Sequence, residues 1–293
     1  MIAALEDYRQ FYAEEIRAVA GVRSDALVQA FAKVPREDFL GPGPWKLASF
    51  DAALSATPRY TLTADADPKS IYHNVLIAID EARSLNNGQP SALAAWLDAL
   101  EIGPGERIVH VGTGLGYYGA IMAEVVGPKG GVVAIEVDAD LAARARENLK
   151  RWRNVEVISG DGSVYDPGPV DAIFVNAGVT HPAPLWLDSL KSGGRLLYPL
   201  TFEAGSAGGK GCMILVKRQG DAYAARATSF VAIYSCTSLR DPDLNTSLVK
   251  QISSGKIFST QSLRHDPHDT DDTCIAHAKD TCLSQRGLTS ALS

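Results

Sequence analysis

The sequence predicts an α/β protein of the Rossmann-like type, and three features of the chain indicate this fold. Between residues 107 and 200, short apolar runs alternate with stretches of helical periodicity, as in a parallel sheet covered by helices on both faces. A glycine-rich turn, GTGLG, follows the first apolar run. Two further strand-like runs, joined by Gly220-Asp221, predict an antiparallel hairpin. We expect a mostly parallel, seven-stranded sheet with this hairpin at one edge.

Residues 1–97 are predicted to form a mostly helical N-terminal cap with the substrate-side loops. An amphipathic helix is expected over residues 1–21, and a second helix begins at the N-cap Ser24 and stops at Pro35. The stretch 41–47 is rich in glycine and proline and predicts a loop. Residues 71–79 fit a strand or a buried turn equally well. A helix over 90–100 has Pro90 in its first turn.

Residues 98–235 are predicted to form the main α/β domain, and residues 236–293 a C-terminal extension with one further strand at 257–263. The expected elements of the domain follow one another as strand and helix, and then as the two arms of the hairpin. The strands are 107–111, 131–137, 155–159, 171–177 and 194–200, the helices are 117–127, 138–152 and 183–193, and the hairpin is 211–219 with 223–235. Trp96, Trp152 and Trp186 are expected to pack helices onto the sheet.

Composition narrows the classes of protein to which the chain could belong. The formal net charge of -6, with no long block of Lys and Arg, argues against a nucleic-acid-binding role. The N-terminus carries charges throughout, unlike a signal peptide, and no apolar run is long enough to span a membrane. Four cysteines in 293 residues do not suggest a disulfide framework. We expect a cytoplasmic enzyme that does not bind membranes; its oligomeric state stays open.

The glycine cluster after the first strand predicts a ligand that approaches the main chain closely. Glycine permits backbone conformations that other residues resist, and the N-terminus of the following helix attracts an anionic group. Gly114, Gly116 and Gly119 fit the dinucleotide pattern G-x-G-x-x-G, whereas Gly112, Gly114 and Gly116 fit G-x-G-x-G with a tighter turn off the strand. The glycines alone leave both NAD and S-adenosylmethionine open.

Polar residues at the ends of the next three strands favour a nucleoside ligand. Glu136 lies 20 residues after Gly116, where a carboxylate can accept hydrogen bonds from ribose hydroxyls. Asp161 stands between glycines after the third strand and can accept from an adenine amine. Asn176 ends the fourth strand, next to small residues. These positions predict a site at the carboxyl ends of the strands.

Taken together, these segments resemble a known family. HVGTGLGYYGAIMAEVVGP, AIEVDADLAARARENL, ISGDGSVYD, DAIFVNAG and LKSGGRLLYPL follow one another as in class I S-adenosylmethionine-dependent methyltransferases. More narrowly, they resemble the protein-L-isoaspartate (D-aspartate) O-methyltransferase family, as does VPREDFLGP at 34–42. The resemblance covers roughly residues 20–235.

The resemblance implies an enzyme that transfers a methyl group from S-adenosylmethionine to a carboxylate on a peptide or protein, leaving S-adenosylhomocysteine; a small-molecule acceptor is a further possibility. It implies contacts to the amino-acid end, the ribose and the adenine of the cofactor, and one residue lining the methyl-donor cleft. In that order, these residues are Gly112, Thr113, Gly114 and Gly116, then Glu136, then Asp161 with Gly162, and finally Asn176.

The chain departs from the family pattern in the loop 85–97. The family has Ser or Thr ahead of Gln-Pro, and here Gly88 precedes Gln89 and Pro90. Glycine has no side-chain donor for a substrate carboxylate, so Asn87 or the backbone of Gly88 is expected to take over. Because a carboxylate is already ionised at neutral pH, the reaction needs no general base, and no catalytic residue is assigned. A hydroxyl or amine acceptor would need one, for which the nearby residues are His73, Asp80, Glu81 and His181.

Two other functions and one other site stay open from the residues. The chain could be an NAD-dependent oxidoreductase that uses the register of Gly114, Gly116 and Gly119, or a cofactor-binding protein without turnover. The extension holds residue types that bind zinc, but their spacings match no zinc module, and we expect surface loop and structural thiols and no metal. These residues are His265, His268, Cys274, His277 and Cys282.

Overall fold

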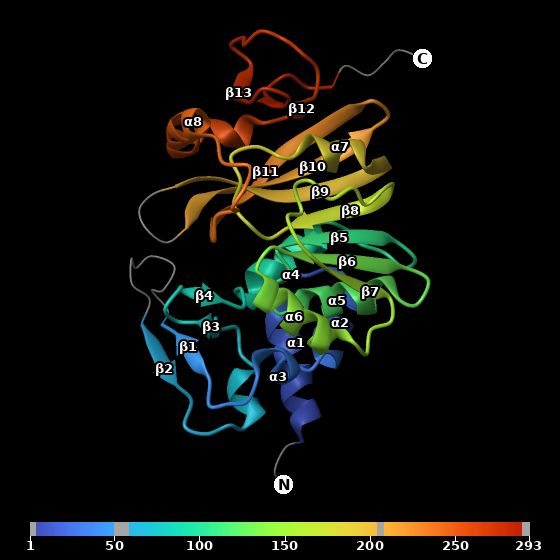
Figure 1. Ribbon diagram of the computed structural model, residues 1–293, viewed down its shortest axis with the longest axis vertical. Helices are drawn as coiled ribbons and strands as arrows, with labels where there is room; N and C mark the ends of the chain where they lie inside the picture. The colour runs from blue at the N-terminus through green and yellow to red at the C-terminus, as the bar shows by residue number, and fades with distance from the viewer. Residues whose placement is uncertain (1–3, 50–58, 204–207, 289–293) are drawn as a thin grey trace. The chain divides into compact units, whose positions relative to one another are not determined.

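The computed structural model describes residues 4–49, 59–203 and 208–288 (Figure 1). The chain forms two compact units, the first from residues 1–108 and 113–160 and the second from residues 109–112 and 161–293. The boundary between the units therefore passes through strand β5 (Arg107–Val111) and the turn after it. The sequence divided the chain by expected role into residues 1–97, 98–235 and 236–293. That division stays a prediction.

The first unit contains the start of the expected strand–helix alternation. Strand β6 (Gly131–Glu136) pairs in parallel with β7 (Val155–Ser159), from Val132 opposite Val155 to Glu136 opposite Ser159. Helices α5 (Tyr117–Val126) and α6 (Ala139–Leu149) pack against these strands. Asp138 caps α6 by accepting hydrogen bonds from the N–H groups of Asp140 and Leu141. The expected bounds of β5 and β7 are confirmed residue for residue.

The N-terminal part has the expected helices together with short strands that were not expected. Helices α1 (Leu5–Ala20), α2 (Asp25–Lys33) and α4 (Pro90–Ala99) are present, and Ser24 caps α2 as predicted. The additional elements are α3 (Glu37–Leu40), a 3₁₀ turn η1 (Pro68–Ile71), and two antiparallel pairs, β1 (Lys46–Ala48) with β2 (Tyr60–Leu62) and β3 (Ala78–Asp80) with β4 (Leu85–Asn86). The stretch 71–79, left open above, is thus a buried turn that leads into β3.

A fully buried arginine organises this part of the first unit. Arg36 donates from its guanidinium to the carbonyl oxygens of Ile71, His73 and Val75 at 2.6, 3.0 and 2.7 Å. Its charge lies 5.6 Å from the centre of the Tyr12 ring. A buried charge is costly unless it is hydrogen-bonded, so the segment 71–75 is held in one conformation by a residue of the VPREDF stretch.

The second unit contains the antiparallel half of the sheet. Strand β8 (Val170–Val175) pairs in parallel with β9 (Leu190–Glu203), and β9, β10 (Gly209–Gln219) and β11 (Ala222–Ile233) follow as antiparallel neighbours. The predicted hairpin is confirmed. The helix expected over 183–193 is wrong in its second half, because α7 (Pro184–Asp188) ends early and the buried Leu190 pairs with Val170 as the start of β9.

The C-terminal extension continues the sheet of this unit. Its elements are α8 (Pro242–Ser253), η2 (Lys256–Ser259), β12 (Ser262–Arg264), β13 (Cys274–His277) and β14 (Cys282–Ser284). The strand order within the unit is β13-β14-β12-β11-β10-β9-β8-β5. The sheet is therefore longer than the seven strands expected, since the extension adds three. The hairpin was expected at one edge of the sheet, and this is wrong, because β12 pairs with the outer side of β11. Of the strand expected at 257–263, the first half is η2 and only its end belongs to β12.

Candidate functional site

The glycine turn of the first unit leaves the main chain open at one position. The N–H of Thr113 donates to the carbonyl of Ile135 at 3.1 Å, which ties the turn to the end of β6. Gly114 has a φ of +58°, and no described heavy atom beyond its chain neighbours lies within 4 Å of where its Cβ would be. Gly116, with a φ of +94°, forms the N-cap of α5, where a Cβ would lie 2.7 Å from Leu149. Gly116 is therefore required by packing, whereas Gly114 faces open space.

Glu136 is directed at this turn. Its Oε2 accepts a hydrogen bond from the N–H of Gly114 at 2.7 Å, and its Oε1 accepts one from the N–H of Asp138 at 3.1 Å. The residue is only 7% exposed. A carboxylate has about four lone-pair sites, so these two bonds orient the group and leave acceptor capacity for hydroxyls of a ligand.

The residues of the second unit meet at the ends of β5 and β8. The N–H of Asn176 donates to the carbonyl of Val111 at 2.8 Å, and its Nδ2 donates to the carbonyl of Gly112 at 3.5 Å. Gly112 has a φ of +78°, and a Cβ there would lie 3.3 Å from the Asn176 carbonyl oxygen. This turn accordingly needs glycine, and Asn176 lies beside it.

Asp161 holds its own loop with one oxygen. Its Oδ1 accepts from the N–H of Ser163 at 2.8 Å and from Oγ of Ser238 at 3.2 Å. Among the residues that the structure describes, none donates a hydrogen bond to Oδ2. Gly162 has a packing role, because a Cβ there would lie 2.7 Å from Cγ1 of Val111. Asp161 thus forms an Asx turn and keeps one oxygen available to a ligand.

In the loop before α4, a hydrogen bond fixes the orientation of the Asn87 side-chain amide. Oδ1 of Asn87 accepts from the N–H of Ile77 at 3.0 Å, and Nδ2 of Asn87 is buried without an acceptor in the described part of the chain. Gly88 has a φ of +83°, and its carbonyl accepts from the Tyr118 hydroxyl at 3.3 Å. The Asn87 amide is therefore fixed by its oxygen and has a donor to spare.

The side chain of Gln89 is used in hydrogen bonds within the protein. Its Nε2 donates to the backbone oxygen of Asn74 at 2.7 Å and to Oδ1 of Asn74 at 2.8 Å, and that Oδ1 also accepts from the N–H of Ser91. Pro90 begins α4. Asn74 and Arg36 were missed as residues that shape this loop. The polar Asn74 within the apolar run 71–79 was the available signal.

Comparison with known proteins decides the family. A model of the family described as protein-L-isoaspartate(D-aspartate) O-methyltransferase matches residues 48–237. The chain belongs to this family. The match contains the loop 85–91, the glycine turn, Glu136 and Asp161.

Individual relatives agree with this assignment. The chain is 32% identical over 205 residues to the protein-L-isoaspartate O-methyltransferase of Ignicoccus hospitalis, covering 69% of this chain and 85% of that protein. It is 32% identical over 186 residues to the enzyme of the same name from Thermotoga maritima, covering 61% of this chain but only about half, 52%, of that protein.

Solved structures confirm the class I methyltransferase fold. A protein-L-isoaspartate O-methyltransferase structure superposes with a TM-score of 0.55 at 25% identity, covering 82% of this chain and 69% of the other. One from Plasmodium falciparum, in complex with S-adenosyl-L-homocysteine, gives a TM-score of 0.57 at 18% identity, covering 78% and 97%. By family, the chain is an S-adenosylmethionine-dependent O-methyltransferase, and the NAD-dependent alternative has no support.

Three of the four side chains considered as general bases for this methyltransferase have other partners. Glu81 pairs with Lys46, and Oδ1 of Asp80 accepts from the N–H of Arg83. Nδ1 of His181 lies 3.0 Å from the Thr180 hydroxyl, and burial lowers the pKa of this imidazole. His73 is exposed. None of these contacts indicates a base poised for proton abstraction.

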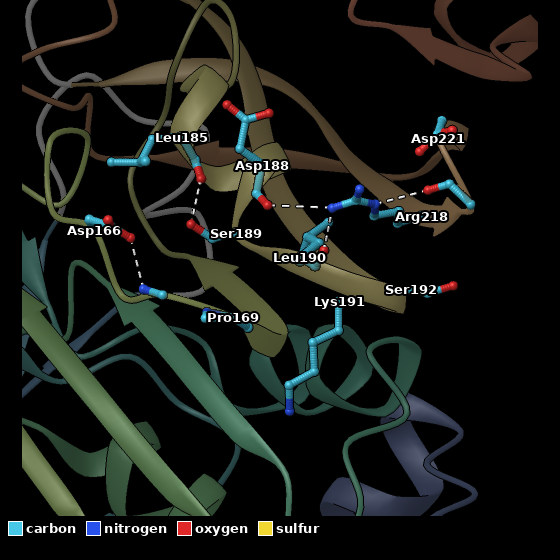
Figure 2. Close-up of a pocket in the computed structure, with 12 residues that line it drawn as sticks. Asp166, Pro169, Leu185, Asp188, Ser189, Leu190, Lys191, Ser192, Arg218 and Asp221 are labelled. Atoms are coloured by element: carbon cyan, nitrogen blue, oxygen red, sulfur yellow. Dashed lines mark hydrogen bonds between the residues drawn. The ribbon is translucent and has the colours of Figure 1, made fainter.

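A hollow of about 630 Å³ on the second unit of the methyltransferase is lined by none of these residues (Figure 2). Pro169, which precedes β8, and Leu190, which begins β9, line it. Arg218, drawn in the same view, donates to the carbonyl oxygens of Leu190 and Gly220 at 2.6 and 2.9 Å. The hollow is at the amino ends of these strands, whereas ligands of open α/β sheets bind at the carboxyl ends. Arg218 is also already hydrogen-bonded to backbone carbonyl oxygens. We therefore do not assign the hollow to the reaction.

Within residues 4–49, 59–203 and 208–288, no helix combines the length and apolar character needed to cross a membrane.

Proposed function

We propose that this chain methylates the carboxylate of an isoaspartyl residue in a peptide or protein, with S-adenosylmethionine as methyl donor. The observation that carries this proposal is the family match across residues 48–237. The sulfonium supplies an electrophilic methyl group. A carboxylate oxygen of the acceptor forms the new C–O bond while the S–C bond breaks, and the electron pair goes to sulfur to give neutral S-adenosylhomocysteine. The products are a methyl ester and the spent donor.

Each part of the donor has a candidate residue. Glu136, oriented by two backbone N–H groups, would accept from the ribose hydroxyls, and Gly114 would let the amino-acid end approach the main chain. The oxygen Oδ2 of Asp161 would accept from the adenine amine. These residues bind and orient, and alignment of this kind contributes about 7–11 kcal/mol to lowering a barrier. No proton transfer is needed, because the acceptor is already ionised.

Asn87 would replace the hydroxyl that Gly88 lacks. A Cβ at Gly88 would lie 3.0 Å from Leu93, and the φ of +83° disfavours any side chain, so a serine would not fit there without strain. The Nδ2 of Asn87 is buried and has no acceptor in the described chain. An unpaired buried donor costs about 1–3 kcal/mol, and a hydrogen bond to the acceptor carboxylate would remove this cost.

A methyl-transfer assay tests the acceptor. The full chain is incubated with donor labelled in the methyl group and with two peptides of one sequence, one isoaspartyl and one aspartyl. We expect base-labile label in the isoaspartyl peptide alone. Equal labelling of both peptides, or none, would reject the isoaspartyl acceptor. Label in proteins of a cell extract without label in the peptide would place the acceptor among other carboxylates.

The Asn87→Asp variant tests the donor group. It keeps Oδ1 as an acceptor for the N–H of Ile77 and for the Arg36 guanidinium, 3.5 Å away, and it removes the Nδ2 donor. A carboxylate acceptor should therefore lose one hydrogen bond. We expect kcat/KM for the peptide to fall at least about tenfold, the size of one lost hydrogen bond to a charged group, while affinity for S-adenosylhomocysteine stays unchanged. Asn86→Asp, one residue earlier, is the matched control, and equal losses in both variants would contradict the role of Asn87.

A further inference from the structure

The C-terminal extension brings four potential metal ligands together. His268, Cys274, His277 and Cys282 each place one ligand atom so that all four atoms lie within 4.8 Å of one another. In a tetrahedral zinc site, with Zn–S of about 2.3 Å and Zn–N of about 2.0–2.1 Å, neighbouring ligand atoms lie about 3.3–3.8 Å apart. The observed set therefore needs only small side-chain adjustments to reach that geometry. It lies beyond residue 237, where the family match ends.

The hairpin β13–β14 supplies three of the four ligands. His277 lies directly opposite Cys282 in the register, so their side chains leave the same face. Cys274 is three residues before His277 and would face the other side of a regular strand. A register shift between Cys274 and Ala276 interrupts the alternation, as a bulge does. The irregularity returns Cys274 to the side of the other two.

His268 is delivered by the loop that follows β12, and its ring is already oriented. Nδ1 lies 2.7 Å from the backbone carbonyl oxygen of Asp266, and Nε2 lies 3.9 Å from Sγ of Cys274. Because a carbonyl can only accept, the proton is on Nδ1 and the lone pair of Nε2 faces the cluster. A ring nitrogen bonded to a backbone carbonyl opposite the coordinating nitrogen is a recurrent arrangement in metal sites.

Of the other three members of the cluster, His277 has a ring nitrogen without a partner in the part of the chain that the structure describes, and the two thiols have only long contacts there. Nδ1 of His277 is buried and has no hydrogen-bond partner in the described residues, a cost that a bound metal would remove. The rings of His268 and His277 lie 4.7 Å apart at 86°. Sγ of Cys274 lies 3.4 Å from the N–H of Asp271 and 3.7 Å from its Oδ1, and Sγ of Cys282 lies 3.4 Å from the carbonyl oxygen of Leu283.

The neighbouring histidine of the extension does not belong to this group. Nδ1 of His265 lies 2.8 Å from the carbonyl oxygen of Asp280, and its Nε2 lies 3.3 Å from Oδ1 of Asp188. Both ring nitrogens are therefore in use. The cysteines at 274 and 282 are free thiols in the structure. A disulfide between them would leave the convergence of two histidines on the same point unexplained.

We propose that His268, Cys274, His277 and Cys282 bind one zinc ion as a closed structural site. Two thiolates and two neutral imidazoles are a common donor set for tetrahedral zinc. All four positions come from the protein, so no position is left for water or substrate, and the ion stabilises the extension without taking part in methyl transfer. It joins the loop 265–273 to the hairpin, two segments too short to bury a core of their own. This revises the expectation of surface loop and structural thiols.

Metal analysis of the full-length chain tests the site. The chain is purified without a chelator and in the presence of a reductant. We expect about one zinc ion per chain, and a reduction to background in Cys274→Ser and in Cys282→Ser. The matched controls are Cys236→Ser, a cysteine outside the cluster, and His265→Gln, a histidine next to it. Both should keep the zinc. Absence of zinc from the wild type, combined with no uptake on titration with zinc chloride, would overturn the proposal.

A second measurement needs no variant and so does not depend on how the variants fold. The wild-type chain is stripped with a chelator and titrated with Co²⁺. We expect thiolate-to-cobalt charge-transfer absorption and strong visible bands that saturate at one equivalent, together with a higher Tm than the stripped chain. A spectrum of octahedral cobalt would overturn the site. So would a disulfide between Cys274 and Cys282 in the chain as purified, located by peptide mapping and mass spectrometry.

Discussion

The N–H of Gly114 donates to Oε2 of Glu136 at 2.7 Å. The carboxylate at the end of β6 is therefore held at the position of the glycine turn that has the most open surroundings. The two residues are 22 positions apart in the chain. Their contact fixes the carboxylate where a ligand on the turn would meet it. Charge-assisted bonds of this kind are short and about twice as strong as neutral ones.

Replacing Glu136 by Gln should therefore weaken cofactor binding more than it weakens the fold. The amide can accept only through one atom, and its NH₂ group would face a backbone N–H. We expect the affinity for S-adenosylhomocysteine, measured by calorimetry, to fall about tenfold or more, since a hydrogen bond to a charged group contributes about 1.5–3 kcal/mol. Glu156→Gln, an exposed carboxylate on β7, is the control. Unchanged affinity in a folded Glu136→Gln protein would contradict ribose binding by this residue.

Gly114→Val tests whether the ligand lies over the main chain of the turn. The substitution meets no described atom but must adopt a φ of +58°, which costs a residue with a Cβ about 1–2 kcal/mol. We expect a similar loss of stability in Gly105→Val, where φ is +82° and the surroundings are equally open. Only Gly114→Val should weaken cofactor binding, at least about tenfold, equivalent to 1.4 kcal/mol. If the two variants bind the cofactor equally well, the ligand does not lie over this turn.

Asp161 can be tested by separating its two oxygens. Asp161→Asn keeps an acceptor for the N–H of Ser163 and so preserves the Asx turn, but it replaces Oδ2 by a donor. Asp161→Ala removes both functions. If Oδ2 accepts from adenine, both variants should bind S-adenosylhomocysteine at least about tenfold more weakly. Wild-type affinity in the Asn variant, with weak binding in the Ala variant, would mean that Asp161 acts only through its loop.

The sequence was sufficient to predict those elements whose signals lie within one short stretch of the chain. The apolar runs of β5 and β7 and the N-cap Ser24 mark their elements without reference to the rest of the fold. Helix α8 has comparable signals, an Asp241 cap and buried residues at Leu244, Leu248 and Ile252, and it could have been predicted from them.

Contacts between distant residues explain most of what the sequence could not predict. The conformation of 71–75 depends on three hydrogen bonds from Arg36, and no periodicity in either segment announces such a contact. The metal cluster likewise depends on the register shift between Cys274 and Ala276. Spacing along the chain places Cys274 and His277 on opposite faces of a strand, so the ligand set becomes visible only once that irregularity is known.

The buried His110 on β5 leads us to predict that the free energy of unfolding falls at acid pH. Its ring is fully buried, stacks on Phe174 at 5.2 Å, and has no hydrogen-bond partner in the described structure for either nitrogen. Burial lowers the pKa of this imidazole to about 3, whereas the ordinary value in an unfolded chain is about 6.5. The unfolded state therefore binds more protons between these two values. Stability contributed by neutral His110 is present above about pH 6.5 and is lost as the pH falls below it.

The expected slope is up to about 1.4 kcal/mol of unfolding free energy per pH unit. In His110→Phe this dependence should vanish, because the replacement ring keeps the stacking and cannot be protonated. Urea unfolding between pH 7 and pH 4.5 measures it, and the wild type should lose about 2–3 kcal/mol more than the variant over this range. His73→Gln, which changes an exposed histidine, should follow the wild type. Parallel curves for wild type and His110→Phe would mean that the ring reaches water in the native state and titrates there as it does in the unfolded chain.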